Sequence, residues 1–383
     1  GVRSVLALEA EDDEPWTAPP SRKVSDPPIT APLPSELDLV LGDQVYIAKE
    51  HLPAQLRNRL VRLAAFQNPE FYRAQSMRLP VYDKPRIIQC AEDLPKHFAL
   101  PRGLLGDIEA LLQRLKVKPR LRDERSAGTS LQVSFRGELR PEQLVAAKAM
   151  LAHETGVLAA TTAFGKTVLS AWLIAQRGVN TLVLVHRQQL LNQWVERLSQ
   201  FLGVPPGGIG QLGAGRKRVT GLIDVAIIQS LVRKGVVRDL VANYGHLVVD
   251  ECHHLSAHSF ELVARRAKAR FVTGLSATVT RKDGHHPIIF MQCGPVRYRV
   301  NAREQAAARP FANCVIVRPT NFVAVGPAET DSRFQFHTLY QSLIIDPARN
   351  QLICGDVLEA VRLGRKPLVL TERTEHLERL AVL

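Results

Sequence analysis

One stretch of this 383-residue chain decides its fold: Gly156-Val-Leu-Ala-Ala-Thr-Thr-Ala-Phe-Gly-Lys-Thr-Val-Leu-Ser-Ala-Trp-Leu-Ile-Ala175. It runs from a short apolar segment, predicted to be a strand, through a loop of small residues into an amphipathic helical pattern. In such a unit the backbone N–H groups of the loop and the positive end of the helix point at one spot. The stretch therefore predicts a phosphate-binding strand, loop and helix.

The loop has the features of a nucleotide-binding P-loop. We expect Lys166 to reach the β- and γ-phosphates of ATP and the Thr167 hydroxyl to ligate Mg²⁺. The strict pattern has Gly where Ala160 stands, and Ala163 also occupies a place that is usually Gly. An Ala with positive φ costs about 1 kcal/mol, which a loop tolerates. The predicted nucleotide-contacting residues of the loop are Thr162, Ala163, Phe164, Gly165, Lys166 and Thr167. An ordinary strand–turn–helix with a chance Gly-Lys-Thr is the alternative.

A second run, Leu247-Val-Val-Asp-Glu251, is an apolar strand pattern that ends in two carboxylates. In a parallel sheet the carboxyl end of this strand faces the same crevice as the phosphate loop. We expect Asp250 to hold Mg²⁺ through water and Glu251 to orient or deprotonate the attacking water. Lys166, Asp250 and Glu251 are thus the predicted catalytic residues. A pair of acids that caps a helix N-terminus is the alternative.

Two histidines, His253 and His254, follow the acids after Cys252. A metal site is disfavoured, because no second cluster of ligands lies at suitable spacing. We instead interpret His253 as a polar coupler to Ser276 and Thr278, with His254 as its neighbour.

The run Asp250-Glu-Cys-His-His254, followed by Thr273-Gly-Leu-Ser-Ala-Thr-Val-Thr-Arg-Lys-Asp-Gly284, resembles DEAD/DEAH-like helicases and translocases of superfamily 2. The resemblance is strongest to the branch that holds XPB-type repair helicases and helicase subunits of restriction-like systems. Leu139-Arg-Pro-Glu-Gln143 resembles the family's adenine-reading segment, which implies that Arg140 and Gln143 contact the base.

Three more segments are similar to parts of this family that contact nucleic acid: Leu184–Trp194, Ala226–Leu231 and the basic loop Gly213–Arg218. A plain surface loop is the alternative for the last of them. The nucleic-acid contacts that the resemblance implies are His186, Arg187, Gln229, Ser230, Arg216 and Lys217.

The predicted fold class is α/β: a RecA-like, P-loop, doubly wound parallel sheet preceded by a small α/β accessory domain. Four regions are expected: a disordered acidic and Pro-rich linker at 1–36, the accessory domain at 37–130, the motor domain at 137–300, and a linker with the truncated start of a second RecA-like domain at 301–383. The motor strands are expected at 157–160, 181–185, 223–228, 246–250 and 271–275.

The flanking regions carry weaker patterns. In the accessory domain we expect strands at Leu39–Ala48 and Arg86–Cys90, and helices lined by two sets of residues: Leu52, Leu56, Leu60 and Leu63, then Leu104, Ile108, Leu111 and Leu115. The densely basic Lys116–Arg125 predicts either a nucleic-acid contact or a solvated surface. Near the end we expect a helix from Arg349, a strand at Pro367–Leu370 and a helix at Glu375–Leu380.

Composition narrows the partners. The formal net charge of +13 favours a polyanion, and with the motor motifs it favours nucleic acid, DNA rather than RNA. No apolar run approaches the roughly 20 residues of a membrane helix, so no membrane partner is expected. The five scattered cysteines lack CxxC spacing, which argues against disulfides and zinc and fits a reducing, cytoplasmic location.

These patterns predict an ATP-hydrolysing helicase or translocase with ATP and Mg²⁺ as cofactors. The family places ATP between two RecA-like domains, the second of which supplies an arginine finger. Nothing here matches that segment, so slow hydrolysis is expected. The alternatives are a duplex translocase of a defence system, a binding module with a vestigial ATP site, and a P-loop small-molecule kinase. Nuclease, primase or other domains are possible partners in a longer protein.

Overall fold

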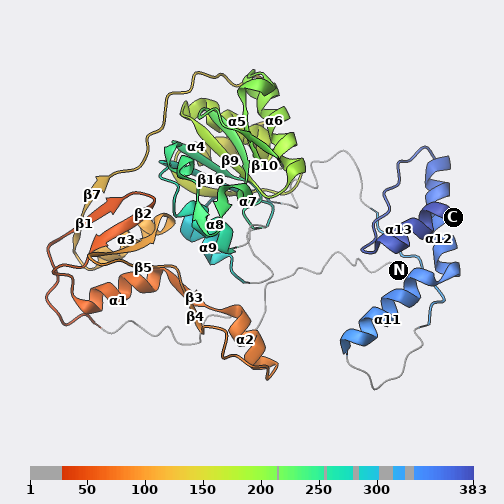
Figure 1. The fold of residues 1–383 in the computed structure, drawn as a ribbon, viewed down its shortest axis with the longest axis horizontal. Coiled ribbons are helices and arrows are strands. Elements are labelled where there is room, and N and C mark those ends of the chain that lie inside the picture. The colour runs from red at the N-terminus through yellow and green to blue at the C-terminus, as the bar shows by residue number, and fades with distance from the viewer. Residues whose placement is uncertain (1–27, 214, 254–256, 279–283, 302–313, 324–331) are drawn as a thin grey trace. The chain divides into compact units, whose positions relative to one another are not determined.

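The structure, a computed structural model, describes residues 28–213, 215–253, 257–278, 284–301, 314–323 and 332–383 (Figure 1). The chain divides into two compact units, Gly1–Ala308 and Arg309–Leu383. Most of the predicted linkers, residues 1–27 and 302–313, lie outside the described residues, and so does His254.

An eight-stranded sheet forms the centre of the first unit, in the order β11-β10-β12-β9-β15-β16-β8-β17. Its strands are β8 (Thr155–Ala159), β9 (Thr181–Val185), β10 (Gly210–Gly213), β11 (Arg216–Arg218), β12 (Ile223–Ile227), β15 (His246–Val249), β16 (Phe271–Ser276) and β17 (Val296–Arg299). All neighbours pair in parallel except β10 and β11. The predicted parallel α/β sheet is confirmed, and each of the predicted motor strands is present.

Helices cover both faces of this sheet, as a doubly wound fold requires. One face carries α4 (Pro141–Leu151), α5 (Lys166–Arg177) and α6 (Gln188–Leu202), and the other carries α7 (Ile228–Leu231), α8 (Ala257–Ala264) and α9 (Pro287–Cys293) (Figure 1). Because strand side chains alternate, Val248 packs into the first core, and Leu247 and Val249 into the second. A short pair, β13 (Val232–Arg233) and β14 (Val236–Val237), and the 3-10 turns η2 (Pro206–Gly208) and η3 (Asp239–Asn243) complete the domain.

The accessory domain has its own five-stranded sheet, in the order β5-β6-β2-β1-β7. Its strands are β1 (Glu36–Leu41), β2 (Gln44–Ala48), β5 (Glu92–Asp93), β6 (His97–Pro101) and β7 (Lys118–Asp123). The prediction of one strand over Leu39–Ala48 is wrong. The chain reverses at Gly42-Asp43, where the Gly42 N–H donates to the Gln44 carbonyl at 2.8 Å, and β1 and β2 pair antiparallel.

Helices α1 (Ala54–Leu63) and α3 (Leu105–Arg114) pack against this sheet, and three of the predicted apolar positions, Leu56, Leu60 and Ile108, are fully buried. Both helices are shorter than predicted, because Leu52 precedes α1, Leu104 precedes α3 and Leu115 follows it. The 3-10 turn η1 (Arg102–Leu104) precedes α3. A smaller lobe holds α2 (Pro69–Ser76) and the strand pair β3 (Ala65–Gln67) and β4 (Ile87–Gln89), and β4 confirms the strand predicted at Arg86–Cys90.

The second unit contains α11 (Ser332–Ile345), α12 (Pro347–Arg362) and α13 (Thr374–Val382). The helices predicted from Arg349 and at Glu375–Leu380 are confirmed. The strand predicted at Pro367–Leu370 is wrong: these residues form no strand, and Leu368 and Leu370 are 82% and 84% exposed. A strand needs a neighbour for its hydrogen bonds, and the described part of this unit contains none. No described helix of the chain is long and apolar enough to cross a membrane.

Candidate nucleotide-binding site

The predicted site residues converge at one edge of the motor sheet. The loop that ends in Lys166 follows β8, Asp250 follows β15, and Ser276 ends β16. Since these strands are parallel neighbours, their carboxyl ends meet at the same edge. This is the edge at which open α/β sheets bind ligands.

The loop between β8 and α5 has the backbone of an anion site. Ala163 has φ 66° and Gly165 has φ 91°, so the strain expected at Ala163 is present. Position 165 also has no room for a side chain, because a Cβ there would lie 2.4 Å from Gln143 Nε2. Ala160 is not among the described residues with positive φ, so its change from Gly brings no such strain.

Lys166 begins α5 and lies across this loop, with only 9% of its side chain exposed. Its Nζ lies 3.2 Å from the Ala160 carbonyl oxygen and 3.1 Å from Glu251 Oε1. The two predicted halves of the site therefore contact each other directly. A phosphate chain could replace both of these partners of the ammonium group.

The acid pair follows β15 in a constrained geometry. Asp250 is 6% exposed, and its burial raises the pKa of the carboxyl group above the ordinary value. Asp250 Oδ1 accepts from the Glu251 N–H at 3.0 Å, and Oδ2 accepts from Trp194 Nε1 at 2.7 Å. Each oxygen keeps free lone pairs, so the carboxylate fits a hydrated Mg²⁺, with the Thr167 hydroxyl on the neighbouring helix as second ligand.

Trp194 is a site residue that the sequence prediction missed. It was expected only within the nucleic-acid-contacting segment, yet it lies 1% exposed on α6 and holds Asp250. The available signal was its indole N–H, because a buried tryptophan usually finds a hydrogen-bond acceptor.

The predicted contact between His253 and Ser276 is present. Ser276 Oγ lies 2.8 Å from His253 Nδ1, which is 3.3 Å from Glu251 Oε2. The Ser276 hydroxyl also donates to the backbone carbonyl of Thr278, so Thr278 contacts Ser276 through its backbone. Lys166, Glu251, His253 and Ser276 thus form one polar path, in which the 3.3 Å approach of His253 to Glu251 Oε2 is a close contact and not a hydrogen bond. Their coupling role remains a prediction.

Arg140 and Gln143, expected to contact adenine, hold the phosphate loop. The Gln143 amide and the Arg140 guanidinium each donate to the Phe164 carbonyl oxygen at 2.7 Å. Gln143 Oε1 accepts from the Arg140 N–H at 2.9 Å, which closes the N-terminus of α4. Their contact with adenine stays a prediction.

The predicted nucleic-acid residues fall into two places. His186 and Arg187 follow β9, and Gln229 and Ser230 lie in α7 directly after β12, so all four are at the carboxyl edge. Two further predicted residues lie elsewhere, on the exposed strand β11 at the side of the sheet: Arg216 and Lys217. Arg216 donates to Asn192 Oδ1 at 3.0 Å, which ties β11 to α6.

The basic segment of the accessory domain is partly neutralised. On β7, Lys118 and Arg120 lie 3.7 Å and 3.3 Å from the Glu36 carboxylate. Arg122 lies 3.2 Å from Glu124. These pairs favour a solvated surface over a nucleic-acid contact for β7.

Comparison with known proteins agrees with this geometry. Residues 136–281 match the family described as "Type III restriction enzyme, res subunit". They form a superfamily 2 helicase domain. The superfamily 2 domain holds every predicted site residue, and the match leaves out the accessory domain and the second unit.

Two curated relatives are of the XPB type. The "DNA 3'-5' translocase XPB2" of Sulfurisphaera tokodaii is 31% identical over 169 residues, which are 44% of this chain and 37% of that protein. The "DNA 3'-5' helicase XPB" of Kineococcus radiotolerans is 29% identical over 257 residues, which are 63% of this chain and 44% of that protein. The chain thus spans less than half the length of these relatives.

A solved structure shares the fold. The UvsW helicase of bacteriophage T4 aligns with a TM-score of 0.52 and 16% identity, covering 69% of this chain and 99% of that one. At this identity the likeness supports the fold alone. It extends beyond the superfamily 2 domain, since the matched family segment is shorter than the aligned part.

Proposed function

We propose that this chain is part of an ATP-dependent motor that acts on DNA as a helicase or translocase. The observation that carries the proposal is the continuous path from Lys166 through Glu251 and His253 to Ser276. It joins a phosphate-binding loop to an acid pair and to the segment around Ser276. The family resemblance links that segment to coupling between ATP hydrolysis and nucleic-acid binding. The names of the XPB-type relatives support DNA as the partner.

The residues present fit ATP and Mg²⁺. Bound Mg²⁺ would neutralise charge on the β- and γ-phosphates and would be held by Thr167 and Asp250. Lys166 would leave the Ala160 carbonyl and Glu251 to contact the phosphates. Glu251, thereby released from the ammonium group, would orient the attacking water.

The movement of Lys166 and Glu251 would also affect the predicted DNA-contacting residues. Glu251 Oε2 contacts His253, and His253 contacts Ser276 at the end of β16. The predicted DNA contacts His186, Arg187, Gln229 and Ser230 lie on this edge, so a shift of the polar path would change the grip on the strand.

The test is DNA-stimulated ATP hydrolysis by the purified chain, with Lys166→Ala as the variant and Lys148→Ala as the control, since Lys148 is exposed on α4. We expect the first substitution to abolish hydrolysis and the second to leave it unchanged. Equal hydrolysis by the Lys166 variant would refute the proposal. Hydrolysis that DNA does not stimulate would refute the nucleic-acid part.

Hydrolysis by these 383 residues is expected to be slow, because no residue in the sequence matches the arginine finger of a second motor domain. A longer form of the protein that contains such a segment should hydrolyse ATP faster by orders of magnitude. A brisk rate for the 383 residues alone would contradict this expectation.

Translocation along duplex DNA without strand separation is the second candidate, because one XPB-type relative is named a translocase and the other a helicase. Displacement of a triplex-forming strand combined with failure to open a forked duplex would identify translocation. Failure to bind ATP would instead support a vestigial site. Nuclease or primase partners and a cytoplasmic location stay predictions.

A further inference from the structure

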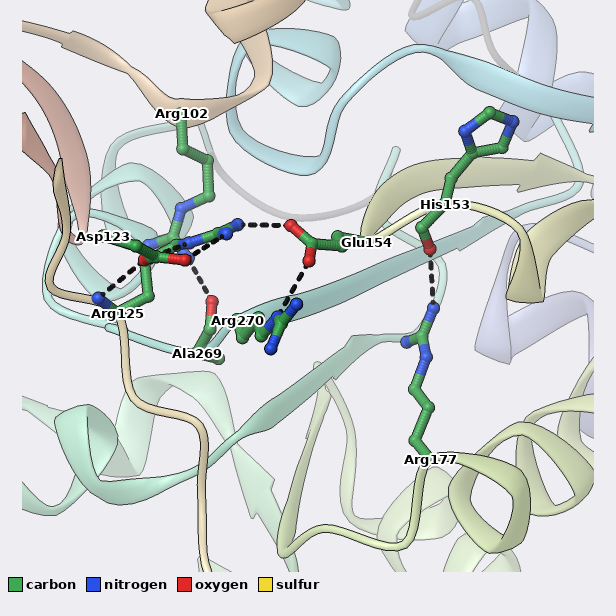
Figure 2. Close-up of polar contacts among 8 residues, drawn as sticks. All are labelled: Arg102, Asp123, Arg125, His153, Glu154, Arg177, Ala269 and Arg270. Atoms are coloured by element: carbon green, nitrogen blue, oxygen red, sulfur yellow. Dashed lines mark hydrogen bonds and ion pairs between the residues drawn. The ribbon is translucent and has the colours of Figure 1, made fainter. Parts of the chain in front are cut away.

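The accessory domain grips one turn of the motor domain. This turn, residues 264–270, joins the end of α8 to the start of β16. From η1, the Arg102 guanidinium donates to the carbonyl oxygens of Ala264 at 2.7 Å and of Ala269 at 3.2 Å, and also to that of Ala267. Figure 2 shows Arg102 reaching Ala269 from the accessory domain.

Arg102 is buried without a carboxylate partner among the described residues. It is 7% exposed, and this burial lowers its pKa to about 10, which leaves the group charged at neutral pH. The Asp43 carboxylate attracts the charge, and so does the carboxyl end of α8, because the last carbonyls of a helix carry partial negative charge and have no partner within the helix. One guanidinium satisfies three carbonyls of the turn at once.

A second set of contacts holds the same turn from the segment between the two domains. Ser126 forms a single parallel β-bridge with the turn: its N–H donates to the Lys268 carbonyl at 2.7 Å, and its carbonyl accepts from the Arg270 N–H at 3.1 Å. Glu154 lies 2.8 Å from both Arg125 Nη1 and Arg270 Nε (Figure 2). The turn is therefore held on both sides.

The accessory domain packs closely against helix α9 of the motor domain. A Cβ on Gly103 would lie 2.2 Å from the Phe290 carbonyl oxygen on α9. Ile288 and Met291, also on α9, belong to the hydrophobic core of the accessory domain. The two domains thus share a core next to the turn.

The gripped turn lies between two functional segments. Helix α8 comes shortly after the acid pair, and β16, six residues long, ends at Ser276. A shift of the turn would move Ser276, which contacts His253 and whose carbonyl accepts from the Ala160 N–H at the start of the phosphate loop at 2.9 Å. We propose that Arg102 and Glu154 form an interdomain clamp by which the accessory domain positions the polar path for ATP turnover.

The first test is kinetic and rests on the proposed function. Arg102→Ala should lower kcat about tenfold or more and change the KM for ATP by a smaller factor, because a small misplacement of catalytic groups has such effects. Arg102→Lys keeps the charge but cannot reach three carbonyls, so it should recover only part of the loss. Glu154→Gln should lower kcat less. Arg114→Ala is the matched control, since Arg114 is exposed on α3.

The second test does not depend on hydrolysis. Hydrogen exchange should be faster in Arg102→Ala and Arg102→Lys at the amides of β16, and unchanged at those of β9. Unchanged exchange at β16, or unchanged kcat with an active wild-type chain, would overturn the clamp. A wild-type chain without ATPase activity would refute the proposed function, and exchange at β16 would still decide the clamp.

Discussion

The two edges of the motor sheet hold similar groups in different arrangements. At the carboxyl edge, Lys166 has two partners, the Ala160 carbonyl and the Glu251 carboxylate. At the amino edge, Arg177 Nη1 lies 2.6 Å from His246 Nε2 and 2.8 Å from Thr273 Oγ1, and Nη2 donates to the His153 carbonyl at 3.2 Å (Figure 2 shows the last contact).

The two edges differ in whether a ligand can replace the partners of the buried cation. A phosphate would replace the partners of Lys166, because these partners lie at the carboxyl edge of the sheet, where open α/β sheets bind ligands. The partners of Arg177 are backbone and strand groups that the fold fixes, and burial lowers its pKa to about 10. We therefore expect substitutions at the carboxyl edge to change turnover, and those at the amino edge to change stability.

Among the substitutions that should leave ATP binding intact, the largest effect is expected for Glu251→Gln. Loss of the group that orients water should lower kcat at least about 100-fold while ATP still binds, since general-base removal has effects of this size. Steady-state hydrolysis and titration with a fluorescent ATP analogue measure the two quantities. Glu196→Gln, at an exposed position of α6, is the control. A kcat within threefold of wild type would remove Glu251 from the catalytic residues.

At the other edge, Arg177→Met should lower the free energy of unfolding by about 3 kcal/mol, because it leaves buried acceptors without a donor. Urea unfolding measures this quantity. The exposed Arg197→Met should change it by less than about 0.5 kcal/mol. Equal free energies of unfolding for the two variants would show that the contacts of Arg177 do not stabilise the fold.

A pH effect should come from His246, which is fully buried beside Arg177. Burial, with a smaller contribution from Arg177, holds its pKa well below the ordinary 6.5. Only the unfolded chain then takes up a proton just below pH 6.5, so the stabilisation present above pH 6.5 is lost as pH falls. The loss is at most about 1.4 kcal/mol per pH unit.

Urea unfolding between pH 7.5 and 5.5 checks this, with His246→Gln as the variant. The variant should lose stability more slowly than wild type as the pH falls. Parallel slopes for the two proteins would show that His246 does not titrate differently on folding.

The smallest effect is expected in the phosphate loop. Ala163→Gly should raise the free energy of unfolding by about 0.5 kcal/mol, because Ala163 has φ 66° and Gly adopts such angles without strain. Ala160→Gly should lower it instead, since Ala160 has no positive φ to relieve. The same sign for both variants would contradict the loop geometry. Thermal unfolding of the two proteins measures the difference.

Local pattern predicted much of the candidate site. Lys166 follows a strand and opens a helix, and Asp250 and Glu251 end an apolar run, so each could be placed from its neighbours in sequence. Trp194 could not, because its partner Asp250 is 56 residues away and nothing in the helical pattern of α6 indicates which acceptor its N–H meets. The strand expected at Pro367–Leu370 failed for the same reason: a strand depends on a distant neighbour.

The sequence by itself determined the order of motor strands and helices, the phosphate loop and the acid pair, because apolar periodicity and turn residues act over a few positions. Only the tertiary structure decided that Lys166 meets Glu251, that Arg140 and Gln143 hold the loop, and that Arg102 grips the turn before β16. These contacts join residues far apart in the chain, and their geometry follows from strand order and domain packing rather than from local preference.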